Sequence, residues 1–110
     1  MLYRIAVISD SEKENKKLRE VLSLYFPYHL IVENKTKFDI AAQKYAKTQR
    51  CGCTIVHAVS NDFIYKEFIK NNPDMFILFW DGDSDDMRYF VKKTHIDKIP
   101  TLIYYEEKIS

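Results

Sequence analysis

Acidic and small polar residues gather where an apolar run ends, in the stretch FWDGDSDD at 79–86. Asp81 and Gly82 form a typical turn pair, and Ser84 followed by two aspartates has the pattern of a capped helix start. A helix start offers unpaired N–H groups and a partial positive charge, which bind anions and phosphate above all. Each carboxylate at about 4 Å would repel such an anion by ~1 kcal/mol in water. The sequence therefore predicts a phosphate-type turn whose own acids oppose phosphate.

Further polar residues follow the other apolar runs, and one cation, Arg88, lies near the helix start and could reach an anion over the turn. We predict no catalytic residue, no metal and no cofactor. Any remaining ligand pocket is predicted to be built from Asp10, Asn34, Asp39, Asp81, Gly82, Ser84 and Arg88.

The two cysteines, Cys51 and Cys53, flank a glycine, which is neither the C-x-x-C spacing of redox enzymes nor a complete zinc set. His57 follows in the same apolar run. We expect the cysteines to be small buried residues at a strand entry, with metal or redox use as the alternative. His29 and His95 receive no role.

Strand-type apolar runs alternate with helical patterns along the chain. Strands are predicted at 3–9, 29–34, 53–59, 75–80 and 99–105. Helices are predicted after the capping pairs Ser11/Glu14 and Thr36/Asp39, over 60–72, and after Ser84. Their inward faces are expected to carry Leu18, Val21, Leu22 and Tyr25; Phe38, Ala41, Ala42 and Tyr45; Ile64 and Phe68; and Met87, Phe90, Val91 and Thr94.

This alternation predicts one α/β domain over 1–110, a three-layer α/β/α Rossmann-like fold with a mostly parallel five-stranded sheet. The run MFILFW at 75–80 is apolar throughout, as a strand covered on both faces needs. Ligands of such sheets bind outside the carboxyl ends of the strands, so the candidate residues belong to one edge of the molecule.

Composition narrows the function classes. The chain has 17 basic and 16 acidic residues, a net charge of +1, and its basic residues alternate with other types. We therefore expect no nucleic-acid partner, which would favour a basic stripe. No apolar stretch has the length of a membrane span and no signal peptide opens the chain, so we expect a cytoplasmic protein.

FWDGDS at 79–84, followed by a helix and KIPTLIYY at 98–105, resembles the SLOG superfamily, which includes LOG-type phosphoribohydrolases, DprA-type proteins and small bacterial and phage members. Asp39, Ala42, Tyr45 and Ala46 match the helix that follows the family's second strand. The resemblance implies a Rossmann-like fold with a nucleotide-type ligand at the glycine-rich turns. Gly82 is the one family turn glycine present here, and Asp86 and Met87 replace a Gly-Thr pair. We therefore predict a degenerate SLOG-type module, non-catalytic, that binds a protein partner or a small nucleotide-like ligand.

Two alternatives stay open. A response-regulator-like pseudo-receiver would place Asp10 among acidic metal ligands, but Val59 and Ser60 stand where a phospho-accepting aspartate belongs. The other is a LOG-like nucleotide hydrolase or a nucleotide-derivative sensor. The hydrolase would need the family's catalytic motif with its Arg and Glu together with a P-G-G-x-G-T loop, and the sequence has neither.

Partner surfaces are predicted at LYFPYH (24–29) and YYEE (104–107), where aromatic side chains could stay exposed, and an edge strand could pair with a second copy of the chain. KIPTL at 98–102 also resembles the segment around the thioredoxin cis-proline, which would make Pro100 cis.

Overall fold

The protein is described by a computed structural model that covers residues 2–11 and 16–105. Nine elements alternate along it: β1 (Tyr3–Ser9), α1 (Lys16–Leu24), β2 (Tyr28–Val32), α2 (Lys37–Thr48), β3 (Gly52–Ile55), α3 (Asn61–Lys70), β4 (Met75–Trp80), α4 (Asp85–Ile96) and β5 (Thr101–Tyr105). The strands form one sheet in the order β3-β2-β1-β4-β5. Every pairing is parallel, so the predicted fold class is confirmed and the sheet is wholly rather than mostly parallel.

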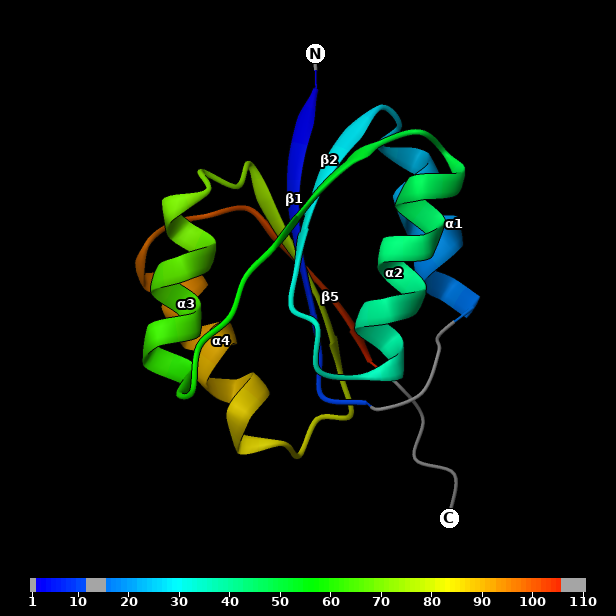
Figure 1. Cartoon of the computed structure of the whole chain (residues 1–110). Coiled ribbons are helices and arrows are strands. Elements are labelled where there is room, and N and C mark those ends of the chain that lie inside the picture. The colour runs from blue at the N-terminus through cyan, green and yellow to red at the C-terminus, as the bar shows by residue number, and fades with distance from the viewer. Residues whose placement is uncertain (1, 12–15, 106–110) are drawn as a thin grey trace.

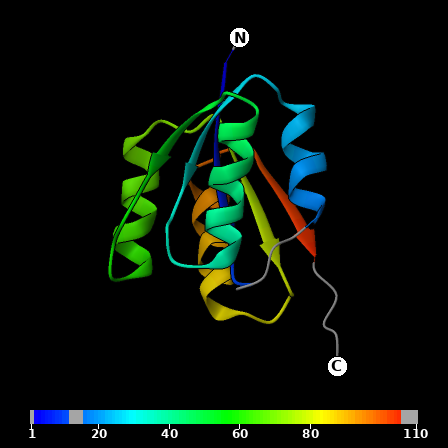
Figure 2. The ribbon, with the colours of Figure 1, turned by 45° about the vertical axis from the view of Figure 1, so that its right-hand side comes forward.

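The strand order explains the three layers. The chain steps outward from β1 through β2 to β3, then crosses back to β4 and β5. Right-handed crossovers put α1 and α2 on one face of the sheet and α3 and α4 on the other (Figure 1). Turning the molecule brings β3 and β5 into view as the two edge strands (Figure 2).

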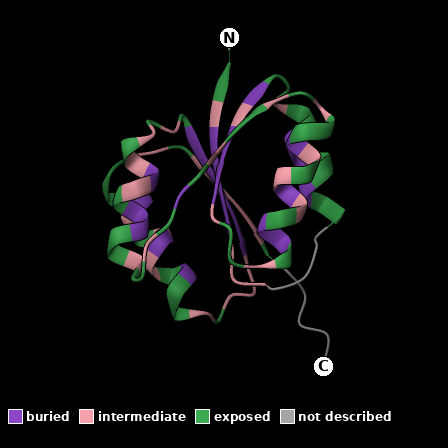
Figure 3. Ribbon diagram, in the orientation of Figure 1, coloured by how far each residue is buried: buried purple, intermediate pink, exposed green. Residues whose placement is uncertain are grey.

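Two cores follow from the alternation of side chains along the strands. Ile5 and Val7 of β1 face α1 and α2, whereas Ala6 and Ile8 face α3 and α4. Buried residues therefore make up most of the central strands and recur along the helices, where they are purple in Figure 3. All five inner residues of MFILFW, 75–79, are buried, which confirms a strand covered on both faces.

Strand bounds differ from prediction mainly at the edges. The third strand ends at Ile55 rather than residue 59, because its one neighbour β2 ends at Val32, the register partner of Ile55. Beyond that point Val59 is 98% exposed. β2 covers 28–32 instead of 29–34, and β5 begins at 101 rather than 99, after a proline without an N–H.

The helices agree more closely. α3 spans 61–70 within the predicted 60–72, with Ser60 as its N-cap, and the Thr36/Asp39 capping box of α2 is present. Glu14 of the Ser11/Glu14 pair lies outside the described residues. Four predicted inward residues, Tyr25, Ala41, Tyr45 and Val91, are half-buried rather than buried.

One local prediction is wrong. Cys53 is exposed and Cys51 half-buried, because β3 is an edge strand with open space on one side. The sequence left open whether Pro100 is cis. Within the described residues the one cis peptide bond joins Phe26 and Pro27, so Pro100 is trans.

Candidate functional site

The predicted site residues all lie at the carboxyl edge of the sheet, in three places. Asp10 follows β1; Asn34 and Asp39 belong to the turn from β2 into α2; Asp81, Gly82, Ser84 and Arg88 belong to the turn from β4 into α4. β1 and β4 are neighbours with Ser9 beside Phe79, so their polar ends lie at the same part of this edge. This is also where the strand order reverses, the usual ligand position of the fold.

The turn into α2 uses its polar groups internally. Asp39 is only 5% exposed, and its Oδ2 accepts the N–H groups of Lys35 at 3.0 Å and Thr36 at 3.2 Å. The Thr36 hydroxyl oxygen in return accepts the N–H of Asp39 at 3.2 Å. The Oδ1 of Asn34 accepts a hydrogen bond from the Gln43 amide at 3.1 Å. Asp39 is therefore a capping residue, and its buried carboxylate does not face a ligand.

Glu33, the first residue after β2, is a functional candidate that the site prediction left out. Its Oε2 lies 3.2 Å from Lys35 Nζ, and its side chain is 15% exposed. Burial raises the pKa of this carboxyl, against the opposing effect of the Lys35 ammonium. Its position directly after an apolar strand was the signal that could have identified it.

The turn into α4 is closed by its own aspartate. Asp81 Oδ1 accepts the N–H groups of Asp83 at 2.8 Å and Ser84 at 3.0 Å. Gly82 has φ of +92°, a conformation that side-chain-bearing residues avoid. Ser84 Oγ accepts the Met87 N–H at 3.3 Å, as an N-cap does. An anion would therefore have to displace Asp81 and Ser84 to reach these N–H groups.

Arg88, the cation near this turn, also has partners within the chain. Its guanidinium nitrogen lies 3.3 Å from Asp85 Oδ1, and its guanidinium carbon lies 5.9 Å from the centre of the Trp80 ring. Trp80 donates its indole N–H to the Ser84 carbonyl at 3.1 Å and packs against Tyr105 with ring centres 5.8 Å apart. The site prediction did not include Trp80 or Tyr105.

The second aspartate of the helix start holds α3 and α4 together. Asp86 Oδ1 accepts the Asn61 amide at 2.8 Å, and the Tyr89 hydroxyl donates to Asp62. That hydrogen bond lowers the pKa of Asp62, while desolvation and the same bond raise the pKa of Tyr89 to about 12. Asp86 and Asp62 therefore act as links between helices.

The predicted partner surfaces are exposed in part. Leu24 is 75% exposed, Phe26 56% and Tyr105 67%. Tyr28 is fully buried, its hydroxyl bonded to Gln49, because β2 begins there and turns the ring toward α2. Glu106 and Glu107 lie outside the described residues.

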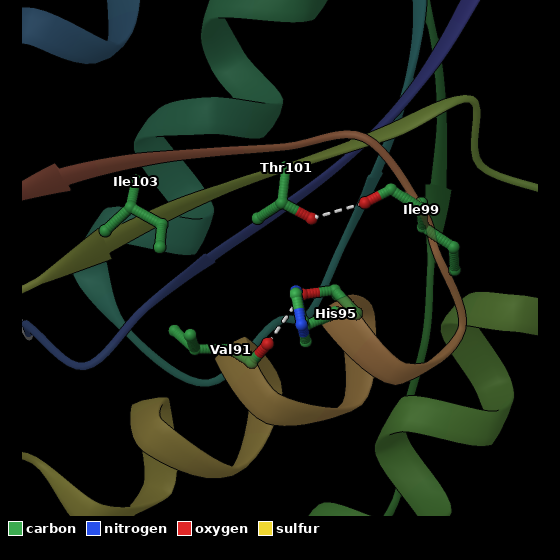
Figure 4. A pocket seen from close by; sticks show the side chains of 6 residues that line it. Val91, His95, Ile99, Thr101 and Ile103 are labelled. Atoms are coloured by element: carbon green, nitrogen blue, oxygen red, sulfur yellow. Dashed lines mark hydrogen bonds between the residues drawn. The ribbon is translucent and has the colours of Figure 1, made fainter.

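A cavity of about 280 Å³ lies away from the carboxyl edge, between α4 and β5. It is lined by Val91, Thr94, His95, Ile99, Thr101 and Ile103, and Figure 4 shows five of these labelled.

No family model, no curated protein and no solved structure matches this chain. Over residues 2–11 and 16–105 no group of three or more His, Cys, Asp and Glu side chains is arranged to hold a metal ion. In the same part of the chain no helix is long and apolar enough to cross a bilayer.

Proposed function

We propose that this protein is a non-catalytic binding module on a SLOG-type scaffold, and that it acts through a protein partner rather than a nucleotide. One observation carries the proposal: the carboxyl-edge groups that would hold a phosphate are used within the chain. Asp81 and Ser84 accept the N–H groups of their own turn, and Arg88 is paired with Asp85. The resemblance in FWDGDS at 79–84 supports the scaffold.

A small nucleotide-like ligand, including the ligand of a hydrolase or sensor, is the second candidate. It is favoured by the place of the site, since the strand order reverses between β1 and β4. The pseudo-receiver alternative is disfavoured. Receivers have the order 2-1-3-4-5 with the third strand inside the sheet, whereas β3 is an edge strand here.

A thermal-shift screen against nucleotides, nucleotide sugars, cyclic nucleotides and ADP-ribose separates these candidates. A ligand at 100 times its Kd stabilises a protein by about 2.7 kcal/mol, and in a domain of this size ~1 kcal/mol raises Tm by roughly 4–8 °C. We expect no shift for the wild-type protein. A shift of this size with any compound would overturn the proposal in favour of the nucleotide-type ligand.

A charge variant tests whether the acids of the turn are the obstacle. Asp85→Asn with Asp86→Asn removes two carboxylates and keeps an acceptor for Asn61. Glu20→Gln with Glu67→Gln removes the same charge from the exposed Glu20 of α1 and the half-buried Glu67 of α3, away from the turn, and is the matched control. We expect a nucleotide shift in the first variant and none in the control. No shift in the first variant would show that the two carboxylates are not the obstacle.

A further inference from the structure

The open edge of β5 has backbone groups available for a further strand. β5 pairs with β4 on one side and ends the sheet. The Phe76 N–H donates to the Pro100 carbonyl at 2.9 Å, which fixes the phase of the pairing. Because the outward direction alternates along a strand, the N–H and C=O groups of Thr101, Ile103 and Tyr105 face away from β4.

The strand lacks the features that normally block edge pairing. Its sequence, TLIYY, has no charge, proline or glycine. Thr101, Leu102, Ile103 and Tyr104 are half-buried and Tyr105 is 67% exposed. The other edge strand, β3, has only four residues. β5 is thus the better template for an added strand.

A groove runs beside this edge on the α4 face of the sheet. The same alternation that turns the backbone of Thr101 and Ile103 outward places their side chains toward α4, where they line the 280 Å³ cavity. Figure 4 shows Val91 and His95 on α4 opposite this strand. A sheet edge beside a helix-lined pocket is the arrangement by which extended peptides bind through backbone hydrogen bonds and alternate side chains.

Beyond the residues that line the cavity, the carboxyl end of β5 carries an aromatic and cationic surface. Tyr105 packs against Trp80, and Arg88 lies over the Trp80 ring. Trp, Tyr and Arg are the residue types most enriched at the energetic centres of protein interfaces. This end supplies apolar contact area and a guanidinium group.

Charge decides which occupant suits the groove. The α4 wall carries Arg88, which is also paired with Asp85 at 3.3 Å, with the exposed Lys92 beside it, and Lys98 is exposed just before the strand. The cavity-lining residues among those described include no carboxylate. A second copy paired through β5 would bring the same cations against these, whereas carboxylates would complement them.

We propose that the β5–α4 groove, defined by Arg88, Val91, His95, Thr101, Ile103 and Tyr105, binds an extended segment of a protein partner that alternates apolar residues with Asp or Glu. The segment adds to the sheet as a sixth strand at β5. This inference rests on the proposed function, since it names the site and class of that module's partner.

Fluorescence anisotropy with the full chain tests the groove. The probe is a fluorescein-labelled peptide of alternating valine and glutamate; the same peptide with lysine for glutamate is its control. We expect the glutamate peptide to bind at least about tenfold more tightly at low salt and to lose affinity as salt rises. Equal affinity of the two peptides, or no binding of either, would overturn the proposal.

Two variants assign the binding to this edge. Ile103→Pro removes an outward N–H without breaking the bonding to β4, and proline is tolerated on edge strands. We expect it to weaken the glutamate peptide about tenfold with an unchanged circular dichroism spectrum, whereas Ile103→Thr, which keeps the N–H, retains most of the affinity. Unchanged affinity in Ile103→Pro would contradict strand addition.

Arg88→Glu with Lys92→Glu should reverse the preference, so that the lysine peptide binds more tightly. Lys37→Glu with Lys44→Glu, on the exposed side of α2, is the matched charge control and should leave the glutamate preference in place.

Sedimentation and the nucleotide screen separate the remaining outcomes. A wild-type dimer that Ile103→Pro converts to monomer would assign the groove to a second copy and overturn the peptide proposal. A wild-type nucleotide shift refutes the proposed function, whereas loss of peptide binding without a nucleotide shift refutes this inference alone.

Discussion

At the scale of single residues, the polar groups of the carboxyl edge hold the chain's own turns. Asp39 was predicted both as a helix cap and as a ligand-binding residue, and the structure places it in the cap, 5% exposed with two backbone donors. Glu33 differs because its carboxyl is largely buried with a lysine as its charged partner. We therefore expect the Asp39 carboxylate to stabilise the fold and the ionised Glu33 carboxylate to destabilise it.

Removing the cap should be costly. Asp39→Ala leaves the N–H groups of Lys35 and Thr36 without their acceptor, and we expect it to lower the free energy of unfolding by about 1–2 kcal/mol. Urea denaturation measures the change. Lys44→Ala, an exposed position on the same helix, is the control and should stay within about 0.5 kcal/mol. A loss for Asp39→Ala no greater than the control's would contradict the capping role.

Glu33 should make stability depend on pH. Its folded-state pKa is raised mainly by burial, so the stability linked to its protonation is present below the ordinary glutamate pKa and is lost as pH rises through the folded-state value. We therefore expect the Tm of Glu33→Gln, relative to that of the wild type, to rise by about 2 °C as the pH increases from 4 to 7. Thermal unfolding across this range measures it, with the exposed Glu20→Gln as the matched control. If the Tm of Glu33→Gln instead falls relative to that of the wild type toward pH 7, the predicted pH dependence is wrong.

At the scale of elements, turn geometry and edge position decide what the residues do. Gly82 lets the β4–α4 turn adopt a positive φ, so that Asp81 can close it. Gly52 serves a different purpose in the β2–β3 pair. A Cβ there would lie 2.6 Å from Nδ1 of His29, whose other ring nitrogen is 2.6 Å from the Thr54 hydroxyl.

A double-mutant cycle tests this close approach. Gly52→Ala should destabilise the protein by about 1–3 kcal/mol through overpacking against the His29 ring. The same change in a His29→Ala background should cost much less, a coupling of at least ~0.5 kcal/mol by urea denaturation. Purely additive losses would show that the ring is not the obstacle.

Gly82→Ala is the contrasting case. No atom lies within 4 Å of a Cβ built there, so its cost, about 1 kcal/mol or more, should come from the φ of +92° and no second-site truncation should relieve it. Gly82→Asn, which tolerates positive φ better, should cost less in the same assay.

At the scale of the whole molecule, one sheet joins two cores. Phe76 packs against the rings of Tyr65 and Phe68 on the α3–α4 face, and Phe79 packs against Phe38 and Tyr104 on the α1–α2 face. Because β4 contributes alternate residues to both cores, damage on either side should weaken the same sheet.

We expect Phe76→Ala and Phe79→Ala each to lower the free energy of unfolding by about 3–5 kcal/mol. Both should still unfold in a single transition, with the fluorescence of the lone Trp80 coinciding with far-ultraviolet circular dichroism. Separate transitions for the two probes would show that the faces unfold independently. Leu24→Ala, at a side chain 75% exposed, is the control.

The sequence by itself determined the order and type of the nine elements, because their hydrophobic periods and capping residues are local signals. The bounds of β1 and β4 agree with prediction. The inner strand β2 covers 28–32 instead of 29–34, and the edge strand β3 ends where its neighbour β2 ends. Cys53 is exposed because it lies in this edge strand. The edge position of β3, and with it the departure from receiver topology, depends on long-range pairing that no local pattern encodes.

For the candidate site, the sequence located the carboxyl-edge residues because strand ends are visible as the limits of apolar runs. It predicted the Thr36/Asp39 capping pair, but it could not tell that Asp81 would accept the N–H groups of Asp83 and Ser84, because that bonding depends on the geometry of the turn. The sequence also did not predict the groove between α4 and β5. Its side chains come from a helix and a strand, and the distance between these two elements is set by packing across the sheet. Only the tertiary structure decided these contacts.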